Sequence, residues 1–256
     1  MNIQPIWNKR ALKVEDAIVV ADLHIGYESE LAEKGVNLPS RSKEMIDSIS
    51  QILRDNNSYR LIINGDLKHN IPKGTWQEYK EIPHAIDEWL KIVEEVHIFK
   101  GNHDGGIERY LPSDVFVHDP SGDIIDGIGY FHGHAHPKEE VARCKNIIIA
   151  HTHPSVYFLD GLGRREKKPC WVKMKIYRGD DEDRRLHDVE NIDKKETQEV
   201  VIIPHFNELL GGISVNRDGY IIPFLNKVSV VEEEVFLLDG TKLGELDNME
   251  SEIMKN

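Results

Sequence analysis

The amino-acid sequence predicts an α/β fold with two β-sheets (α+β by strict classing), and three observations lead to this. Up to about residue 100, apolar runs alternate with helical patterns, which is typical of parallel strands joined by right-handed crossovers. Later apolar runs are short, follow one another with turn residues between them, and indicate a mixed or antiparallel second sheet. Five apolar runs end just before Asp, His or Asn, which places polar side chains at the carboxyl ends of strands.

The first half contains the alternating elements. Strands are expected at 17–21, 60–64 and 96–100. Between the first two, Ser40–Asn57 carries apolar residues on one face at helical spacing, so we expect an amphipathic helix there.

A second helix is expected to begin at Thr75, where Thr75 and Glu78 have the spacing of a capping box. Pro83 is expected to kink or split this helix, because proline removes a backbone donor. The side chains expected to face inward are Trp76, Tyr79, Ile86, Trp89, Leu90 and Val93.

The second half is expected to supply the second sheet. Its short apolar runs lie at 115–117, 124–125, 128–131, 147–149 and 156–159, with a short helix at 137–144. Alternation over 171–177 indicates a half-buried strand, Val200–Pro204 a buried strand, and 228–238 one or two final strands. We interpret 1–256 as a single domain with a core at 1–160 and additional strands at 161–256, which include a charged exposed insertion at about 179–197 and an acidic C-terminal tail.

The charge distribution is uneven. The net charge of −13 argues against a protein that coats itself in nucleic acid non-specifically. Residues 164–178 are nevertheless basic, and residues 232–256 are acidic. The aromatic and lysine side chains of the basic strand either stack bases and hold phosphates or form the solvated face of an edge strand, and we favour the second reading.

Several classes of protein are excluded by composition. No apolar run approaches the roughly 18 residues of a membrane span. Met1–Leu12 has no apolar core of a secretory signal, and two isolated cysteines fit a reducing compartment, so we expect a cytoplasmic protein without a membrane partner.

The residues after the apolar runs form a candidate metal-ligand set. Its members are Asp22, His24, Asp66, Asn102, His132, His151 and His153. These oxygen and imidazole donors favour Mn²⁺, Fe or Zn²⁺, and seven are too many for one ion with open positions. We therefore expect two ions about 3.5–4 Å apart. Asp66 is the expected bridge, with Asp22, His24 and His153 on one ion and Asn102, His132 and His151 on the other.

Charge and position suggest the chemistry. The positive charge of two divalent ions exceeds the negative charge of two carboxylates and a hydroxide. Positive charge therefore remains to attract a phosphate oxygen. His103 follows Asn102 directly and is the candidate general acid, and Asp104 is expected to hydrogen-bond its far ring nitrogen. Asp104 could instead only cap a following helix.

These motifs resemble the five blocks of the calcineurin-like metallophosphoesterase superfamily, in the family's order. The blocks are Asp22-x-His24, Gly65-Asp66, Gly101-Asn102-His103-Asp104, His132 and His151-x-His153. The resemblance implies an αββα sandwich, two divalent ions (Mn²⁺ first, with Fe, Zn²⁺ or Ni²⁺ as alternatives), and phosphoester hydrolysis by a metal-bridging hydroxide.

Two departures and two further segments refine the resemblance. Ala150 stands where the last block usually has Gly, and His69 stands where the second block usually ends in Asp. The segments 169–171 and 203–212 resemble the prokaryotic DNA ligase-associated phosphoesterases and their archaeal relatives, which implies DNA or RNA substrates and DNA-repair partners. His69, His134, His205 and Asn207 are candidates for supporting or substrate contacts.

Three functions follow from this reading. The first is a phosphodiesterase or nuclease with His103 as general acid. The second is a phosphomonoesterase or cyclic-nucleotide hydrolase that uses the same residues. The third is a non-catalytic scaffold for repair proteins. The oligomeric state and the natural substrate stay open.

Overall fold

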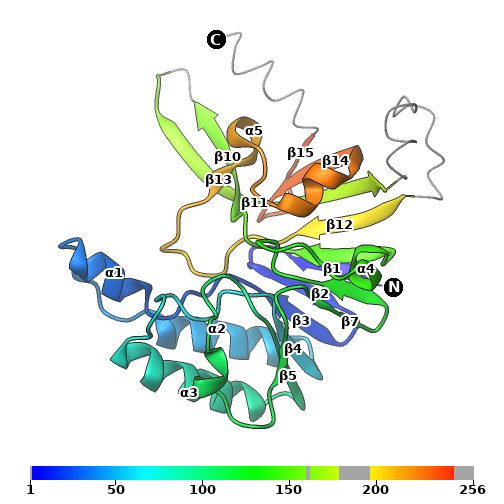
Figure 1. Cartoon of the computed structure of the whole chain (residues 1–256). Helices are drawn as coiled ribbons and strands as arrows, with labels where there is room; N and C mark the ends of the chain where they lie inside the picture. The colour runs from blue at the N-terminus through cyan, green and yellow to red at the C-terminus, as the bar shows by residue number, and fades with distance from the viewer. Residues whose placement is uncertain (1, 160–161, 179–196, 245–256) are drawn as a thin grey trace.

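Two mixed β-sheets lie face to face, and helices cover the outer side of each (Figure 1). The computed structural model describes residues 2–159, 162–178 and 197–244. This is the four-layer αββα sandwich that the resemblance implied.

The first sheet has the strand order β1-β2-β3-β4-β5-β6. Its strands are β1 (Ile3–Ile6), β2 (Ala11–Val14), β3 (Ala17–Val20), β4 (Arg60–Ile63), β5 (Glu95–Phe99) and β6 (Phe116–His118). The first three strands pair antiparallel, whereas β3 to β6 are parallel neighbours. The expected strands at 17–21, 60–64 and 96–100 are therefore present and adjacent in the order β3, β4, β5.

The second sheet has the strand order β13-β10-β11-β12-β9-β8-β7, and β14 pairs with both β11 and β15. Its strands are β7 (Asp123–Ile125), β8 (Ile128–Tyr130), β9 (Asn146–Ile149), β10 (Pro154–Leu159), β11 (Arg165–Tyr177), β12 (Gln198–Ile202), β13 (Ile213–Ser214), β14 (Ser229–Leu237) and β15 (Lys242–Gly244). Strand β9 lies parallel to both β8 and β12, so the carboxyl ends of β8 and β9 reach the same edge.

The helices are short apart from two. They are α1 (Tyr27–Glu33), α2 (Ser42–Asp55), α3 (Trp76–Leu90), α4 (Glu139–Ala142) and α5 (Val215–Asp218), with 3-10 helices at Ile107–Tyr110 and Pro223–Lys227. Helices α2 and α3 lie together against the first sheet (Figure 1). Helices α4 and α5 contribute to the apolar layer on the outer side of the second sheet.

Alternation along the strands builds three apolar layers. In β3, Ile18 and Val20 face the layer shared with α2 and α3, while Val19 faces the layer between the sheets. Strand β9 does the same, with Ile148 between the sheets and Ile149 in the outer layer. A continuous apolar strand is expected wherever both faces of a sheet are covered.

Helix α3 differs in part from expectation. The capping box forms at Thr75 and Glu78, and Ile86 and Trp89 are buried. Trp76 is 84% exposed and Tyr79 is 48% exposed, so their inward placement was wrong. Both lie in the first turn of the helix, where Tyr79 stacks on Tyr110 with ring centroids 4.5 Å apart. The helix also runs unbroken through Pro83.

The basic strand also corrects an expectation. Over 172–176 strand β11 pairs with β12 and with β14 at the same time, so this part of the strand is not an edge strand. Trp171 is fully buried between the sheets and is unavailable for stacking on bases. Lys173 and Lys175 lie opposite Glu234 and Glu232 of β14. Two lysines of the basic stretch thus face two glutamates of the acidic stretch across adjacent strands.

Some expectations fall outside the described residues. The charged insertion lies almost wholly in 179–196, and the acidic tail continues into 245–256. The single-domain interpretation stays a prediction. Among the described residues, no helix is long and apolar enough to cross a membrane.

Candidate metal centre

The candidate ligands follow the carboxyl ends of five strands that meet at one edge of the sandwich. Asp22 and His24 follow β3, Asp66 follows β4, Asn102 follows β5, His132 follows β8, and His151 and His153 follow β9. The first two loops are bonded side by side, since the Asp22 N–H donates to Gly65 O at 3.0 Å and the His24 N–H donates to Asp66 O at 2.9 Å.

An unusual backbone conformation marks these loops. Asp22, His24, Asp66, His151 and His153 all have φ between 43° and 66°. Nine non-glycine residues of the described chain have positive φ, and five of these nine are candidate ligands. Residues held in this sparsely populated region cluster at functional sites, because the surrounding structure must stabilise them.

Two glycines let the loops approach closely. A Cβ on Gly101 would lie 2.1 Å from Asp66 Oδ1, and a Cβ on Gly65 would lie 2.1 Å from His132 Nδ1. Gly65 also has φ of 95°. Any side chain at either position would displace a candidate ligand.

The side chains gather into two adjoining groups. Asp22, His24 and His153 form one, and Asp66, His132 and His151 form the other; within each group the ligating atoms all lie within 4.8 Å of one another. These are the two groups that the sequence predicted, apart from the bridge and Asn102. The Asn102 side chain is exposed at the rim.

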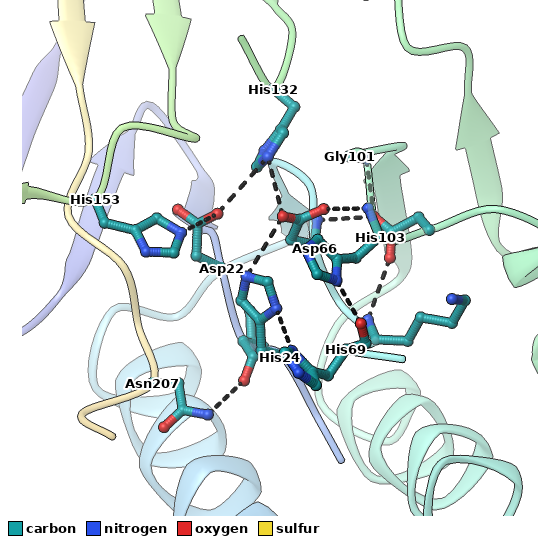
Figure 2. A network of polar contacts seen from close by, with 12 residues as sticks. Asp22, His24, Asp66, His69, Gly101, His103, His132, His153 and Asn207 are labelled. Atoms are coloured by element: carbon teal, nitrogen blue, oxygen red, sulfur yellow. Dashed lines mark hydrogen bonds and ion pairs between the residues drawn. The ribbon is translucent and has the colours of Figure 1, made fainter. Parts of the chain in front are cut away.

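Asp66 joins the two groups through a single oxygen. Its Oδ2 lies 3.4 Å from His24 Nε2 and 3.3 Å from His132 Nε2 (Figure 2). Its Oδ1 accepts the backbone N–H of His103 at 2.8 Å, which holds the carboxylate in this orientation.

Three of the histidines have one ring nitrogen bonded away from the centre. His132 Nδ1 donates to Asn64 O at 2.8 Å, and His153 Nδ1 donates to Gly211 O at 3.3 Å. His24 Nδ1 contacts His69 Nδ1 at 3.0 Å. In each ring Nε2 is the remaining atom, as expected for histidines whose outer nitrogen is fixed by a neighbour and whose inner one binds a metal.

The inward atoms lack protein hydrogen-bond partners. Both carboxylate oxygens of Asp22, His24 Nε2 and His132 Nε2 are buried and unpartnered. His153 Nε2 comes within 3.1 Å of Asp22 Oδ1, but not in hydrogen-bond geometry. Buried polar atoms are normally satisfied, so their convergence fits a cation that would be their common partner. Oxygen and imidazole donors without sulfur suit a divalent transition metal.

The electrostatics of the centre agree with a cation site. Burial disfavours charge on His132, but Asp66 and Asp22 overcome this and raise its pKa to about 9. Burial likewise works against the Asp66 carboxylate, yet His132 and His24 hold its pKa well below the usual range. The two carboxylates are thus ionised and favour a proton on His132, which must leave before His132 Nε2 can bind a metal.

Asp104 corrects the sequence-based expectation. Instead of bonding the ring of His103, its buried carboxylate accepts the N–H groups of Asp66 at 2.7 Å, Gly101 at 2.9 Å and Lys68 at 3.2 Å. Burial and the neighbouring Asp66 raise its pKa to about 6. Its role is to fasten two ligand loops together.

His103 takes its orientation from another group. Its Nδ1 donates to the carbonyl oxygen of His69, and its ring lies 4.6 Å from the ring of His24. The candidate general acid therefore stands beside the ligand groups with Nε2 left for proton transfer.

The other candidates for supporting or substrate contacts are His134, His205 and Asn207. His134 lies 5.5 Å from the His132 ring, and burial lowers its pKa to about 4. The His205 ring lies 5.3 Å from His153, with its pKa lowered by burial to about 3. The Asn207 side chain donates to Leu23 O and accepts the Leu209 N–H, so it supports the loop after Asp22.

Several residues that support the centre were not predicted as site residues. Asn64 donates to Phe131 O and Ile148 O, both at 3.2 Å, and so joins the two sheets. Glu78 accepts the N–H groups of His69 and Asn70. Glu30 lies 2.6 Å from His69 Nε2. Only the Asn64-Gly65 pair at a strand end could have drawn attention, since Glu30 and Glu78 come from separate helices.

Comparison with known proteins places this geometry in context. The family model for calcineurin-like phosphoesterases matches residues 17–227. The structure is similar to nuclease MPE of Pseudomonas putida, with 20% identity, a TM-score of 0.55, and 93% of this chain and 98% of that chain covered. It is also similar to Yfce, a phosphoesterase from E. coli, with 16% identity, a TM-score of 0.36 and coverage of 57% and 74%. No curated protein matches the chain.

Proposed function

Because this chain belongs to the calcineurin-like phosphoesterase family, we propose that it hydrolyses phosphodiesters with a pair of divalent cations. Membership of the family makes the chain a phosphoester hydrolase that uses divalent metal ions. The proposal adds the diester substrate, the number of ions and the roles of the residues.

The observation that carries the proposal is the position of Asp66 Oδ2. It lies almost equally far from His24 Nε2 and His132 Nε2, at 3.4 and 3.3 Å, and each of these atoms belongs to a different ligand group. One carboxylate oxygen between two sets of unpartnered donors supports two ions that share a ligand.

The proposed roles follow from the two groups. Asp22, His24, Asp66 and His153 hold one cation, and Asp66, Asn102, His132 and His151 hold the other. When bound, such ions polarise a phosphoryl oxygen and lower the pKa of water toward about 7. His103 delivers a proton from Nε2 to the leaving oxygen while His69 O holds its Nδ1.

A diester is the proposed substrate class, with DNA or RNA as the first candidates. The similarity in fold to a Pseudomonas putida nuclease supports nucleic acids as test substrates. Mn²⁺ is the proposed metal, since the donor set combines carboxylate oxygens with several imidazoles.

The test compares diester and monoester hydrolysis. The purified chain is loaded with Mn²⁺, its metal content is measured by elemental analysis, and it is assayed on bis-(p-nitrophenyl) phosphate, p-nitrophenyl phosphate and single- and double-stranded oligonucleotides. We expect two ions per chain and preference for diesters. A preference for the monoester would assign the alternative phosphomonoesterase activity. A loaded protein that cleaves none of these would favour the scaffold function.

The role of His103 has its own test. His103→Ala should retain both ions, because its ring belongs to neither ligand group of the proposal. Loss of a general acid should slow oligonucleotide cleavage about 10²–10⁴-fold. Hydrolysis of bis-(p-nitrophenyl) phosphate should fall much less, because p-nitrophenolate leaves without a proton. Equal losses on both substrates, or loss of metal, would contradict the assignment.

A further inference from the structure

A chain of three side chains leads from helix α1 to the candidate metal centre. Glu30 Oε2 lies 2.6 Å from His69 Nε2, and His69 Nδ1 lies 3.0 Å from His24 Nδ1 (Figure 2 shows the contact between the two histidines). His24 Nε2 is the atom that lies 3.4 Å from Asp66 Oδ2. His24 and His69 are buried, and the Glu30 side chain is about one-third exposed.

The contacts determine where the protons lie. An ionised carboxylate only accepts, so His69 Nε2 must donate to Glu30. A neutral His69 then has a lone pair on Nδ1, and His24 Nδ1 must donate to it. His24 is left with its lone pair on Nε2, the tautomer that can bind a cation at the centre.

Two of the other candidate-ligand histidines have a different arrangement. His132 and His153 donate Nδ1 to backbone carbonyl groups, which can only accept and cannot be changed by substitution. Beside His24 stands an imidazole, which can donate or accept at either nitrogen. Without the carboxylate, His69 could present an N–H to His24, and His24 would then carry its proton on Nε2.

Helix α1 holds the His69 ring from a second direction. Tyr27, one turn before Glu30, packs edge-on against the ring at 4.9 Å between centroids. On the other side the His103 ring stacks on it at 5.2 Å. The same residue binds His103 Nδ1 through its carbonyl group. Residue 69 therefore contacts both a candidate ligand and the candidate acid.

We propose that Glu30 is a positioning residue which, through His69, fixes the His24 tautomer and so sets the affinity of one of the two metal positions. The proposal rests on the proposed function for its metal-binding role. Glu30 acts through His69, because neither Glu30 nor His69 belongs to the two ligand groups joined by Asp66.

The test uses Glu30→Gln, which keeps the size of the side chain and removes its charge. Glu33→Gln on the same helix is the matched control, because Glu33 is exposed and its substitution removes the same charge. The first measurement is the ring ¹⁵N spectrum of the metal-free protein, which distinguishes the two neutral tautomers. We expect His24 to be protonated on Nδ1 in the unsubstituted chain and in Glu33→Gln, and mixed in Glu30→Gln.

The second measurement is Mn²⁺ binding by calorimetry. Loss of such an outer partner typically costs 10–100-fold in metal affinity. We expect that loss at one of two positions in Glu30→Gln and none in Glu33→Gln. An unchanged His24 tautomer would overturn the proposal, as would equal weakening of both positions. A third ion per chain would also overturn it, because His24, His69 and His103 would then form a metal group of their own.

The two proposals fail in different ways. If the chain cleaves no diester, the tautomer measurement still tests the role of Glu30, because it needs neither metal nor substrate. If the chain cleaves diesters and Glu30→Gln leaves the His24 tautomer unchanged, only the positioning role is lost.

Discussion

At the scale of the residue, the centre depends on glycines without a side chain as much as on the candidate ligands. Gly101 lets the loop after β5 lie against Asp66, and its backbone N–H donates to Asp104. The two clusters of candidate ligands could be predicted from the sequence, because metal chemistry restricts ligands to few residue types. The fastening role of Asp104 could not, since a carboxylate beside a histidine suggests a bond between the two.

Gly101→Ala tests this close approach. The added Cβ would lie 2.1 Å from Asp66 Oδ1, so the carboxylate must move, and we expect loss of metal from both positions. Gly105→Ala is the control, because its Cβ would meet nothing within 4 Å and its φ is not positive. Elemental analysis of both variants decides the matter. Full metal content in Gly101→Ala would mean that Asp66 is not the bridge.

At the scale of the element, helix termini support the loops that carry the centre. Glu78 completes the capping box of α3 by accepting the Thr75 N–H, and it also accepts the N–H groups of His69 and Asn70. The capping box could be predicted from the spacing of Thr75 and Glu78. Its second use could not, because the spacing says nothing about a loop that precedes the helix and folds back over its first turn.

Thr75→Ala and Glu78→Ala separate these two uses. Loss of the Thr75 cap should reduce the free energy of unfolding by about 1 kcal/mol and leave metal content unchanged. Glu78→Ala leaves three N–H groups without their acceptor, so the loss should exceed about 3 kcal/mol and metal affinity should fall. Urea denaturation and metal titration measure the two effects. Equal effects of the two substitutions would show that Glu78 does no more than cap the helix.

At the scale of the whole molecule, the centre joins two sheets. Asp22, His24 and Asp66 come from the first sheet, and His132, His151 and His153 come from the second. The sandwich could be anticipated from the change in pattern after Asp104. The N-terminal strands β1 and β2 and the helix α1 were not anticipated, because polar residues interrupt the apolar residues of these short segments. Glu30, on that unrecognised helix, was missed for the same reason.

Metal should therefore stabilise the folded protein as a whole. A cation that binds only the folded state at 100 times its dissociation constant adds about 2.7 kcal/mol. Thermal unfolding with Mn²⁺ and after chelation should differ accordingly. His132→Ala removes a ligand from the second sheet and should reduce the difference. A melting temperature that does not change on chelation would contradict a metal centre that links the two sheets.

The left-handed backbone of the five candidate ligands has a consequence for the cost of changing them. Hydrogen bonds between neighbouring loops, such as Asp22 N–H to Gly65 O, hold these conformations. Such a conformation costs on the order of 1–3 kcal/mol for a residue other than glycine. A glycine substituted at one of these positions would relieve part of that cost while removing a ligand, so metal affinity should fall with little loss in the free energy of unfolding.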